Sequence, residues 1–182
     1  MINILENYYK KVIRRDLLNK FRYNNIEEIP RLKKIILNFG CKSSEIKILA
    51  ASLLALELIG VQQSTFTKSR RANILLKIRK GNPVGCTVVL RKNTMYNFLI
   101  KLLIDVFPTL RDFKGIDVAK KLNPSTFSFT IQDLISFKEL EKQFYLFSIL
   151  PPLNVTFITN TKTTKELLYL LSAFKLPFKV SR

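Results

Sequence analysis

The sequence predicts an α+β fold, a single domain with a mostly antiparallel sheet, helices packed on one face and a long basic hairpin loop. Segments in which apolar and polar residues alternate, as in strands, occur among segments with the three-to-four-residue apolar spacing of helices. The chain has 182 residues, of which 47% are hydrophobic, which is enough for one core. It has neither an internal repeat nor a long linker. We therefore expect residues 1–182 to form one domain.

The chain is expected to begin with an amphipathic helix. Apolar side chains recur every four residues from Leu5 to Phe21, with Val12 and Leu18 beside them. The other face of this stretch carries lysines and arginines. This spacing predicts one continuous helix over residues 5–21.

A strand is expected over residues 31–39, since its residues alternate with a period of two. Lys34 and Asn38 share the more polar face with Ile36, and the opposite face is fully apolar. Gly40 ends this strand. Ser43 or Ser44 is then expected to cap a largely buried helix over residues 46–59.

The middle of the chain predicts a long hairpin. Residues 62–67, beginning with Gln62, are strand-like, and residues 84–91 alternate again with Thr87, Val89 and Arg91 on one face. Between them lies a basic segment that ends in the turn sequence Gly-Asn-Pro-Val-Gly at residues 81–85. A basic excursion between two such strands is expected to form a long hairpin loop.

The remaining elements follow from caps and periodicity. Asn93 or Thr94 is expected to cap a helix that runs through Phe107 and ends at Pro108. Residues 127–131 and 153–157 alternate as strands do. Residues 163–166, Thr-Thr-Lys-Glu, have the spacing of a capping box, which predicts a last helix extending to residue 174.

The charge of the chain points to a polyanionic partner. There are 31 Lys and Arg against 13 Asp and Glu, which gives a net charge of +18. No carboxylate occurs between Glu57 and Asp105, whereas nine basic residues do: Lys68, Arg70, Arg71, Lys77, Arg79, Lys80, Arg91, Lys92 and Lys101. A nucleic acid would relieve this repulsion. The alternatives are a basic surface that binds nothing and a membrane surface, which one amphipathic basic helix would fit better than scattered charge.

Catalytic and metal chemistry have little support in this sequence. Histidine, the commonest general base, is absent. Cys41 and Cys86 stand alone in apolar contexts, so we expect two small buried side chains, no metal and no cofactor. The chain is not expected to be an enzyme. No apolar run is long enough for a membrane span, and the first residues resemble neither a signal peptide nor a transit sequence.

Seven motifs, in the same order and at similar spacing, resemble the bacterial-type L5 family of large-subunit ribosomal proteins. They lie at residues 29–40, 67–70, 77–85, 90–99, 111–116, 127–128 and 173–178. Each motif alone is weak, but together they cover almost the whole chain, from about residue 5 to 178. The chain is similar to that family throughout.

This resemblance implies a structural protein of the central protuberance. Family members hold 5S ribosomal RNA and large-subunit rRNA, reach peptidyl-site tRNA through a hairpin loop, and touch a small-subunit head protein across an intersubunit bridge. Carried over to this chain, the rRNA-binding residues are Lys34, Asn38, Gln62, Thr87 and Arg91. The residues that follow tRNA or RNA backbone along the hairpin are Lys68, Arg70, Arg71, Lys77, Arg79 and Lys80.

Some positions depart from the family pattern. Val89 replaces a threonine on the RNA-facing strand, and Leu75 replaces the glycine at the tip of the hairpin. These changes, together with a composition rich in residues that AT-rich codons encode, favour an organelle-encoded member, in a mitochondrion rather than a plastid. The alternative function is a basic RNA-processing factor of an organelle that works away from ribosomes.

Overall fold

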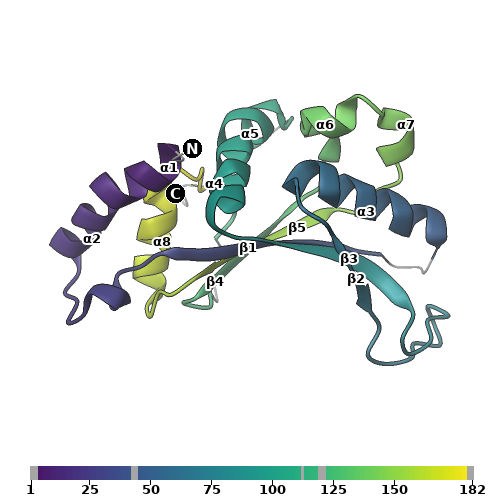
Figure 1. Cartoon of the computed structure of the whole chain (residues 1–182), viewed down its shortest axis with the longest axis horizontal. Helices are drawn as coiled ribbons and strands as arrows, with labels where there is room; N and C mark the ends of the chain where they lie inside the picture. The colour runs from purple at the N-terminus through teal and green to yellow at the C-terminus, as the bar shows by residue number, and fades with distance from the viewer. Residues whose placement is uncertain (1–3, 42–44, 112, 119–121, 180–182) are drawn as a thin grey trace. The chain divides into compact units, whose positions relative to one another are not determined.

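A computed structural model describes residues 4–41, 45–111, 113–118 and 122–179 (Figure 1). Its strands form one five-stranded sheet in the order β2-β3-β1-β5-β4. Their bounds are β1 Leu32–Gly40, β2 Thr65–Lys68, β3 Pro83–Leu90, β4 Thr126–Ile131 and β5 Leu153–Thr159. With the helices, this sheet confirms the predicted α+β fold and each predicted strand region.

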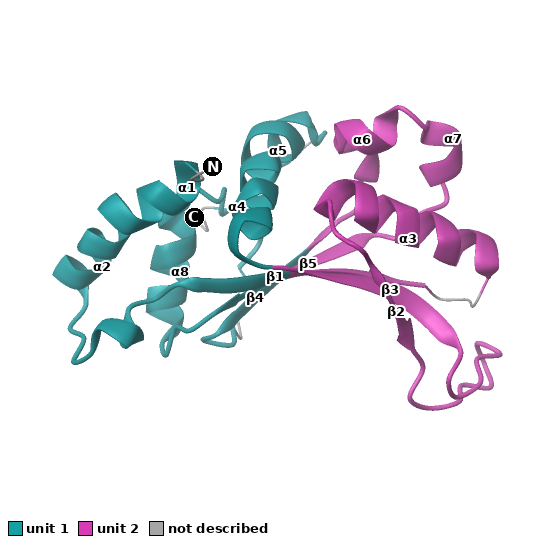
Figure 2. Cartoon of the chain, viewed as in Figure 1, with its two compact units in different colours: residues 1–35, 91–129, 156–182 teal, residues 36–90, 130–155 magenta. Residues whose placement is uncertain are grey.

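The chain divides into two compact units (Figure 2). Unit 1 comprises residues 1–35, 91–129 and 156–182, and unit 2 comprises residues 36–90 and 130–155. Strands β1, β4 and β5 each begin in one unit and end in the other. A single domain over residues 1–182 stays a prediction.

The first helix of unit 1 runs without a break over residues 4–20. It comprises α1 Ile4–Tyr8, a π-helical turn Tyr9–Ile13 and α2 Arg14–Lys20. Ile13 and Leu17 are fully buried. Val12 and Leu18 are 38% and 49% exposed, so the expectation that they join the apolar face was wrong. Val12 immediately precedes the buried Ile13, and Leu18 immediately follows the buried Leu17. Because successive side chains are about 100° apart around a helix, both point away from the buried face.

The next helix of unit 1 covers residues 92–109, as α4 Lys92–Lys101, a π-helical turn Leu102–Val106 and α5 Phe107–Thr109. The predicted cap was wrong, because Arg91 is the N-cap and Thr94 Oγ1 instead donates to the Arg91 carbonyl at 2.8 Å. Pro108 also does not end the helix, which reaches Thr109. Proline is tolerated in the first turn of a helix, and Pro108 is the second residue of α5, the turn that follows the π-helical stretch.

The last helix, α8 Thr164–Ala173, has the capping box that the sequence predicted. Thr163 Oγ1 accepts from the Glu166 N–H, and the Glu166 carboxylate accepts from the Thr163 N–H. Leu167, Leu170 and Leu171 of this helix are buried. The helix therefore begins where the local sequence alone placed its start.

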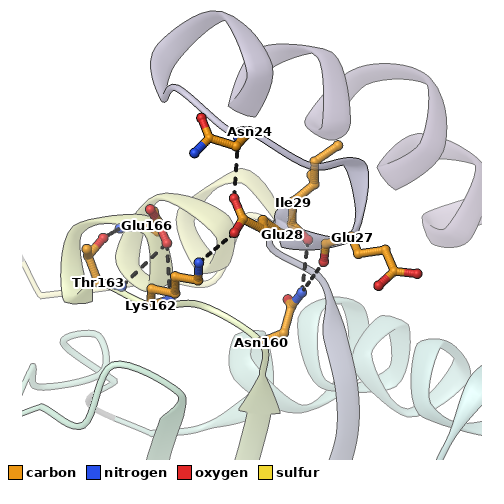
Figure 3. A network of polar contacts seen from close by, with 8 residues as sticks. All are labelled: Asn24, Glu27, Glu28, Ile29, Asn160, Lys162, Thr163 and Glu166. Atoms are coloured by element: carbon orange, nitrogen blue, oxygen red, sulfur yellow. Dashed lines mark hydrogen bonds and ion pairs between the residues drawn. The ribbon is translucent and has the colours of Figure 1, made fainter.

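A polar network in unit 1 ties the end of β5 to the 3₁₀ turn Ile26–Glu28, which precedes β1 (Figure 3). Asn160 Nδ2 donates to the carbonyls of Glu27 and Ile29 at 3.1 Å each, and Asn160 Oδ1 accepts from the Arg31 N–H at 2.6 Å. Lys162 Nζ donates to Glu28 Oε1 at 2.7 Å. This hydrogen bond lowers the pKa of the Glu28 carboxyl below its ordinary value.

Unit 2 places its helices on one side of its strands (Figure 2). They are α3 Ile46–Gly60, the 3₁₀ turn Leu134–Ser136, α6 Lys138–Glu141 and α7 Phe144–Phe147. Glu45 is the N-cap of α3 and makes no side-chain cap bond, while the expected caps Ser43 and Ser44 lie outside the described residues.

Candidate nucleic-acid interface

Strands β2 and β3 form the predicted hairpin. They pair antiparallel with Thr65 opposite Thr87 and Thr67 opposite Gly85, and residues 69–82 form the hairpin loop. The loop closes through two backbone bonds, Ser69 N–H to the Asn82 carbonyl at 2.8 Å and Gly81 N–H to the Ser69 carbonyl at 3.0 Å. The turn predicted over residues 81–85 was misplaced, because β3 already begins at Pro83.

The tip of the loop has its own local order. Asn73 and Ile78 exchange backbone bonds of 2.8 and 3.0 Å, and Asn73 Oδ1 accepts from the backbone N–H groups of Leu75 and Leu76. Lys77 adopts a left-handed backbone with φ of 53°. This asparagine-centred turn holds the side chains of Ile74 and Leu75, which are 92% and 94% exposed, away from the protein.

The six predicted backbone-contacting cations of the hairpin all point to solvent. They are Lys68, Arg70, Arg71, Lys77, Arg79 and Lys80, and each is exposed. None of these six cations is in an ion pair within the described ranges, whereas pairs such as Glu6 with Lys10, Glu28 with Lys162 and Asp117 with Lys179 lie outside the hairpin. The hairpin therefore presents uncompensated positive charge, which suits a phosphate backbone.

Residues on two strands of unit 2 form an open sheet face, on the side away from the helices. Asn38, Thr87 and Val89 are each half-buried, whereas their neighbours Leu37 and Val88 are buried. Thr87 Oγ1 donates to the Leu37 carbonyl at 3.1 Å, which places Thr87 beside the peptide that joins Leu37 to Asn38. The structure thus brings together the predicted residues Asn38 and Thr87.

The structure adds Thr65 to this open sheet face. Thr65 is exposed, lies opposite Thr87 and donates its hydroxyl to the Thr87 carbonyl at 3.2 Å. Sequence reasoning missed it, although the alternation of residues 62–67 could have placed Thr65 and Thr67 on one face. With Thr87 Oγ1 and Thr65 Oγ1 both donating within the protein, their oxygens remain available to accept from a ribose or base.

Gly85 lets the strands meet closely at this face. A Cβ atom at Gly85 would lie 2.4 Å from the Phe39 carbonyl oxygen and 2.9 Å from Thr67 Oγ1. Any side chain there would force β1 and β3 apart. Gly85 is thus required for the position of the strand that carries Thr87.

Gln62 does not open a strand, as the sequence had suggested. Strand β2 begins at Thr65, and Gln62 lies in an exposed bend two residues after α3. Val61, the C-cap of α3, adopts a left-handed backbone with φ of 51° and ψ of 35°. That cap reverses the chain before β2, so the predicted strand start was shifted by three residues.

Lys34 and Arg91 belong to unit 1. Lys34 is half-buried on β1, and Arg91 is exposed at the start of α4 with φ of −139° and ψ of 160°. Arg91 thus follows the last residue of β3 and continues its extended backbone. Its guanidinium has no ion-pair partner within the described part of the chain.

The two cysteines are buried and unbonded to each other, as expected of small apolar side chains. Burial raises the pKa of the Cys86 thiol to about 11, so this thiol stays protonated at neutral pH. Within the described ranges, His, Cys, Asp and Glu form no group of three that suits a metal ion. In those ranges no helix combines the length and the apolar character of a membrane span.

Comparisons with known proteins decide the family. The family described as the ribosomal L5P family C-terminus matches residues 83–178, from β3 to the segment after α8. The large ribosomal subunit protein uL5m of Reclinomonas americana is 40% identical over 97% of this chain and 98% of its own length. The chain belongs to the ribosomal L5 family.

Bacterial relatives match over a similar span. The large ribosomal subunit protein uL5 of Nitrosomonas europaea is 38% identical over 98% of this chain and 99% of its own length. That of Wigglesworthia glossinidia brevipalpis is 37% identical over 96% and 98%. The predicted family is confirmed, and because L5 proteins are structural, so is the prediction that the chain is not an enzyme. The predicted binding residues themselves stay predictions.

Proposed function

We propose that this chain is a structural constituent of the large ribosomal subunit that binds rRNA in two ways. The open sheet face, with Asn38 and Thr87, contacts rRNA by hydrogen bonds, as do Lys34, Gln62 and Arg91. The hairpin loop follows the backbone of RNA. Family membership supports the ribosomal part of this proposal.

One observation carries the RNA-binding part. Six exposed cations on the hairpin have no carboxylate near them in sequence and no ion pair in the described structure. Leaving such charge uncompensated lowers stability, unless an anionic partner offsets the repulsion. Phosphates of large-subunit RNA, 5S rRNA and peptidyl-site tRNA are the partners that the family suggests for this surface.

A salt titration tests the hairpin directly. The full chain binds large-subunit rRNA, and the slope of log affinity against log salt changes by about 0.9 for each phosphate contact. The triple variant Lys77→Gln, Arg79→Gln, Lys80→Gln is expected to lower the slope by about 3. A matched control removes three exposed cations from the N-terminal region instead: Lys11→Gln, Arg15→Gln and Arg22→Gln.

The control variant has the same net charge as the hairpin variant. Its slope is expected to fall by less than about 1, because long-range attraction alone is screened within a Debye length. Equal loss of slope in both variants would show that net charge, and not the hairpin, drives binding.

The proposed ribosome is mitochondrial, with a plastid ribosome as the alternative. The Reclinomonas americana relative is named uL5m, and an organelle origin also fits the composition. The neighbours in this ribosome would include a small-subunit head protein. To test this, large ribosomal subunits are isolated from mitochondria and from plastids and washed at high salt. The chain is expected to sediment with the mitochondrial subunits. Recovery free of ribosomes would favour the RNA-processing alternative.

A further inference from the structure

Unit 1 has a pocket of about 480 Å³ that involves neither the hairpin nor the open sheet face. It lies between the end of α2, one face of α8 and the segment after α8. The face of α8 has the three- and four-residue spacing of neighbours on a helix and consists of Lys165, Leu168, Tyr169 and Ser172. The volume falls within the range of small-ligand sites.

Aromatic rings from all three sides line this pocket. Phe21, Tyr169 and Phe178 belong to its lining, and each is half-buried. The rings of Phe21 and Tyr169 meet edge-on, with 5.8 Å between their centroids. The ring of Phe178 meets the buried Phe127 edge-on at 5.5 Å. Neighbouring rings thus hold the three side chains, while part of each ring remains open to a planar ligand.

The segment that carries Phe178 is fixed by its backbone. Ile116 and Phe178 form a parallel bridge. In it the Ile116 N–H donates to the Pro177 carbonyl at 2.8 Å, and the Lys179 N–H donates to the Ile116 carbonyl at 3.1 Å. Gly115 permits this approach, because its φ is 102° and a Cβ atom there would lie 2.8 Å from the Lys179 nitrogen. This side of the pocket is therefore in place before a ligand binds.

The charged residues of the pocket lining are two lysines. Lys20 Nζ lies 4.2 Å from the centroid of the Tyr169 ring, and Lys165 precedes that tyrosine by one turn of α8. Both lysines are exposed, and neither is in an ion pair within the described ranges. The carboxylate of Asp117, one residue before the lining begins, is already paired with Lys179 at 3.0 Å. Rings combined with such cations suit a ligand that is both planar and anionic.

A nucleotide of RNA has this combination, and other partners suit the pocket less well. A second copy of the chain would bring its own net charge of +18 to the same lysines. A purely apolar protein surface would cover Lys20 and Lys165 without compensating their charge. Ser172 Oγ donates to the Tyr169 carbonyl at 2.9 Å, so its oxygen remains able to accept from the edge of a base.

We propose that this pocket takes one unpaired nucleotide of rRNA, with its base stacked among the rings and the phosphates beside it held by Lys20 and Lys165. The inference rests on the proposed ribosomal function and gives unit 1 an RNA contact with its own residues. Only side chains take part, so the backbone bonds within α8 stay as they are.

Binding of full-length variants to large-subunit rRNA, measured over a range of salt concentrations, tests the pocket. Tyr169→Leu removes a ring and is expected to weaken binding about tenfold at every salt concentration, with an unchanged salt slope, because stacking releases no counterions. Lys20→Gln with Lys165→Gln is expected to lower the slope by about 1.4, or about 0.7 for each single-strand phosphate contact. Tyr169→Phe keeps the ring and should bind like the wild type.

Tyr145→Leu is the matched control for the lost ring, since Tyr145 is 74% exposed on α7 and lies outside the pocket. Its affinity for rRNA is expected to change less than about twofold. Circular dichroism checks that each variant is folded. Because Lys20 and Lys165 are exposed, the double lysine variant still decides the matter if Tyr169→Leu does not fold.

Wild-type affinity in folded Tyr169→Leu, an equal loss in Tyr145→Leu, or an unchanged slope in the lysine variant would each overturn the inference. If a neighbouring protein is then lost from salt-washed large subunits, the pocket holds an acidic protein segment instead. The hairpin variant Lys77→Gln, Arg79→Gln, Lys80→Gln is measured in parallel. An unchanged slope in that variant, with the effects of the pocket variants retained, would contradict the proposed function of the hairpin and leave the pocket standing.

Discussion

Single residues in this chain hold positions that their type does not favour. Val61 has a left-handed backbone, and it is 80% exposed, so packing does not explain the valine. That conformation costs an L-residue about 1–2 kcal/mol and is least tolerated by β-branched residues. We expect Val61→Gly to raise the free energy of unfolding by about 1 kcal/mol, after the larger unfolded-state entropy of glycine is counted.

Urea unfolding of the wild-type chain and of Val61→Gly checks this expectation. The variant should have a higher urea midpoint and an unchanged dependence of the unfolding free energy on urea concentration. Val12→Gly is the control, since Val12 is also an exposed valine but lies within a helical stretch, where glycine is expected to destabilise by about 1 kcal/mol. A lower midpoint for Val61→Gly would mean that the left-handed cap is not strained.

The sequence predicted residue types at the site better than it predicted their bonds. The alternation of β1 and β3 put Asn38 and Thr87 on the less buried face, because burial enforces a period of two. That the Thr87 hydroxyl donates to the Leu37 carbonyl, or that Thr65 joins the same face, depends on register between strands. Register is set by pairing across the sheet, which a single sequence does not display.

At the scale of elements, one side chain holds the end of β5 against the stretch before β1 in unit 1. Asn160 donates to the carbonyls of Glu27 and Ile29 (Figure 3). It also accepts from the Arg31 N–H. Alanine at this position would leave the exposed carbonyl of Glu27 and the partly buried carbonyl of Ile29 without these donors. We expect Asn160→Ala to lower the free energy of unfolding by about 1–3 kcal/mol.

Thermal and urea unfolding measure this loss. Asn154→Ala is the control, because Asn154 makes a single exposed side-chain hydrogen bond, from Thr130 Oγ1 at 2.8 Å. Its cost is expected to be below about 1 kcal/mol. If both variants lose the same unfolding free energy, the network around Asn160 contributes no more to stability than one exposed hydrogen bond does.

Element boundaries were the least predictable part of the fold. The capping box at Thr163 was correct because both of its partners lie within four residues. The caps expected at Asn93 and Thr94, and the stop at Pro108, were wrong because α4 and the turns after it are fixed by buried residues such as Met95, Phe98 and Leu102. Tertiary packing thus overrode local cap preference.

At the scale of the whole molecule, opposite surfaces of unit 2 differ in chemistry. The hairpin and open sheet face offer cations and hydroxyls, whereas α3, on the helix side of the strands, exposes the aliphatic side chains of Ile46, Leu54 and Leu58. The net charge of +18 follows from the sequence. That α3, with one lysine and one glutamate, adds nothing to this charge became informative only when the structure put the helix on the side of the strands away from the open sheet face.

The same charge makes the hairpin loop the part whose order depends most on a partner. Residues 70–77 are all exposed, and the six cations of the hairpin repel one another in the free protein. We expect amide hydrogens of residues 69–82 to exchange rapidly in the isolated chain, even those of Asn73 and Ile78 that are hydrogen-bonded across the tip. Those of β3, between β2 and β1 in the sheet, should exchange slowly.

Hydrogen–deuterium exchange followed by mass spectrometry, with and without large-subunit rRNA, measures this difference. Binding is expected to slow exchange across residues 69–82 by about tenfold or more, because neutralised cations no longer oppose the local order of the loop. Exchange in α8 of unit 1, far from the hairpin in sequence and held by its own capping box, serves as the internal control. Strong protection of the loop in the isolated chain would mean that Asn73 and the closing bonds suffice to order it, and that the positive charge has a different cause.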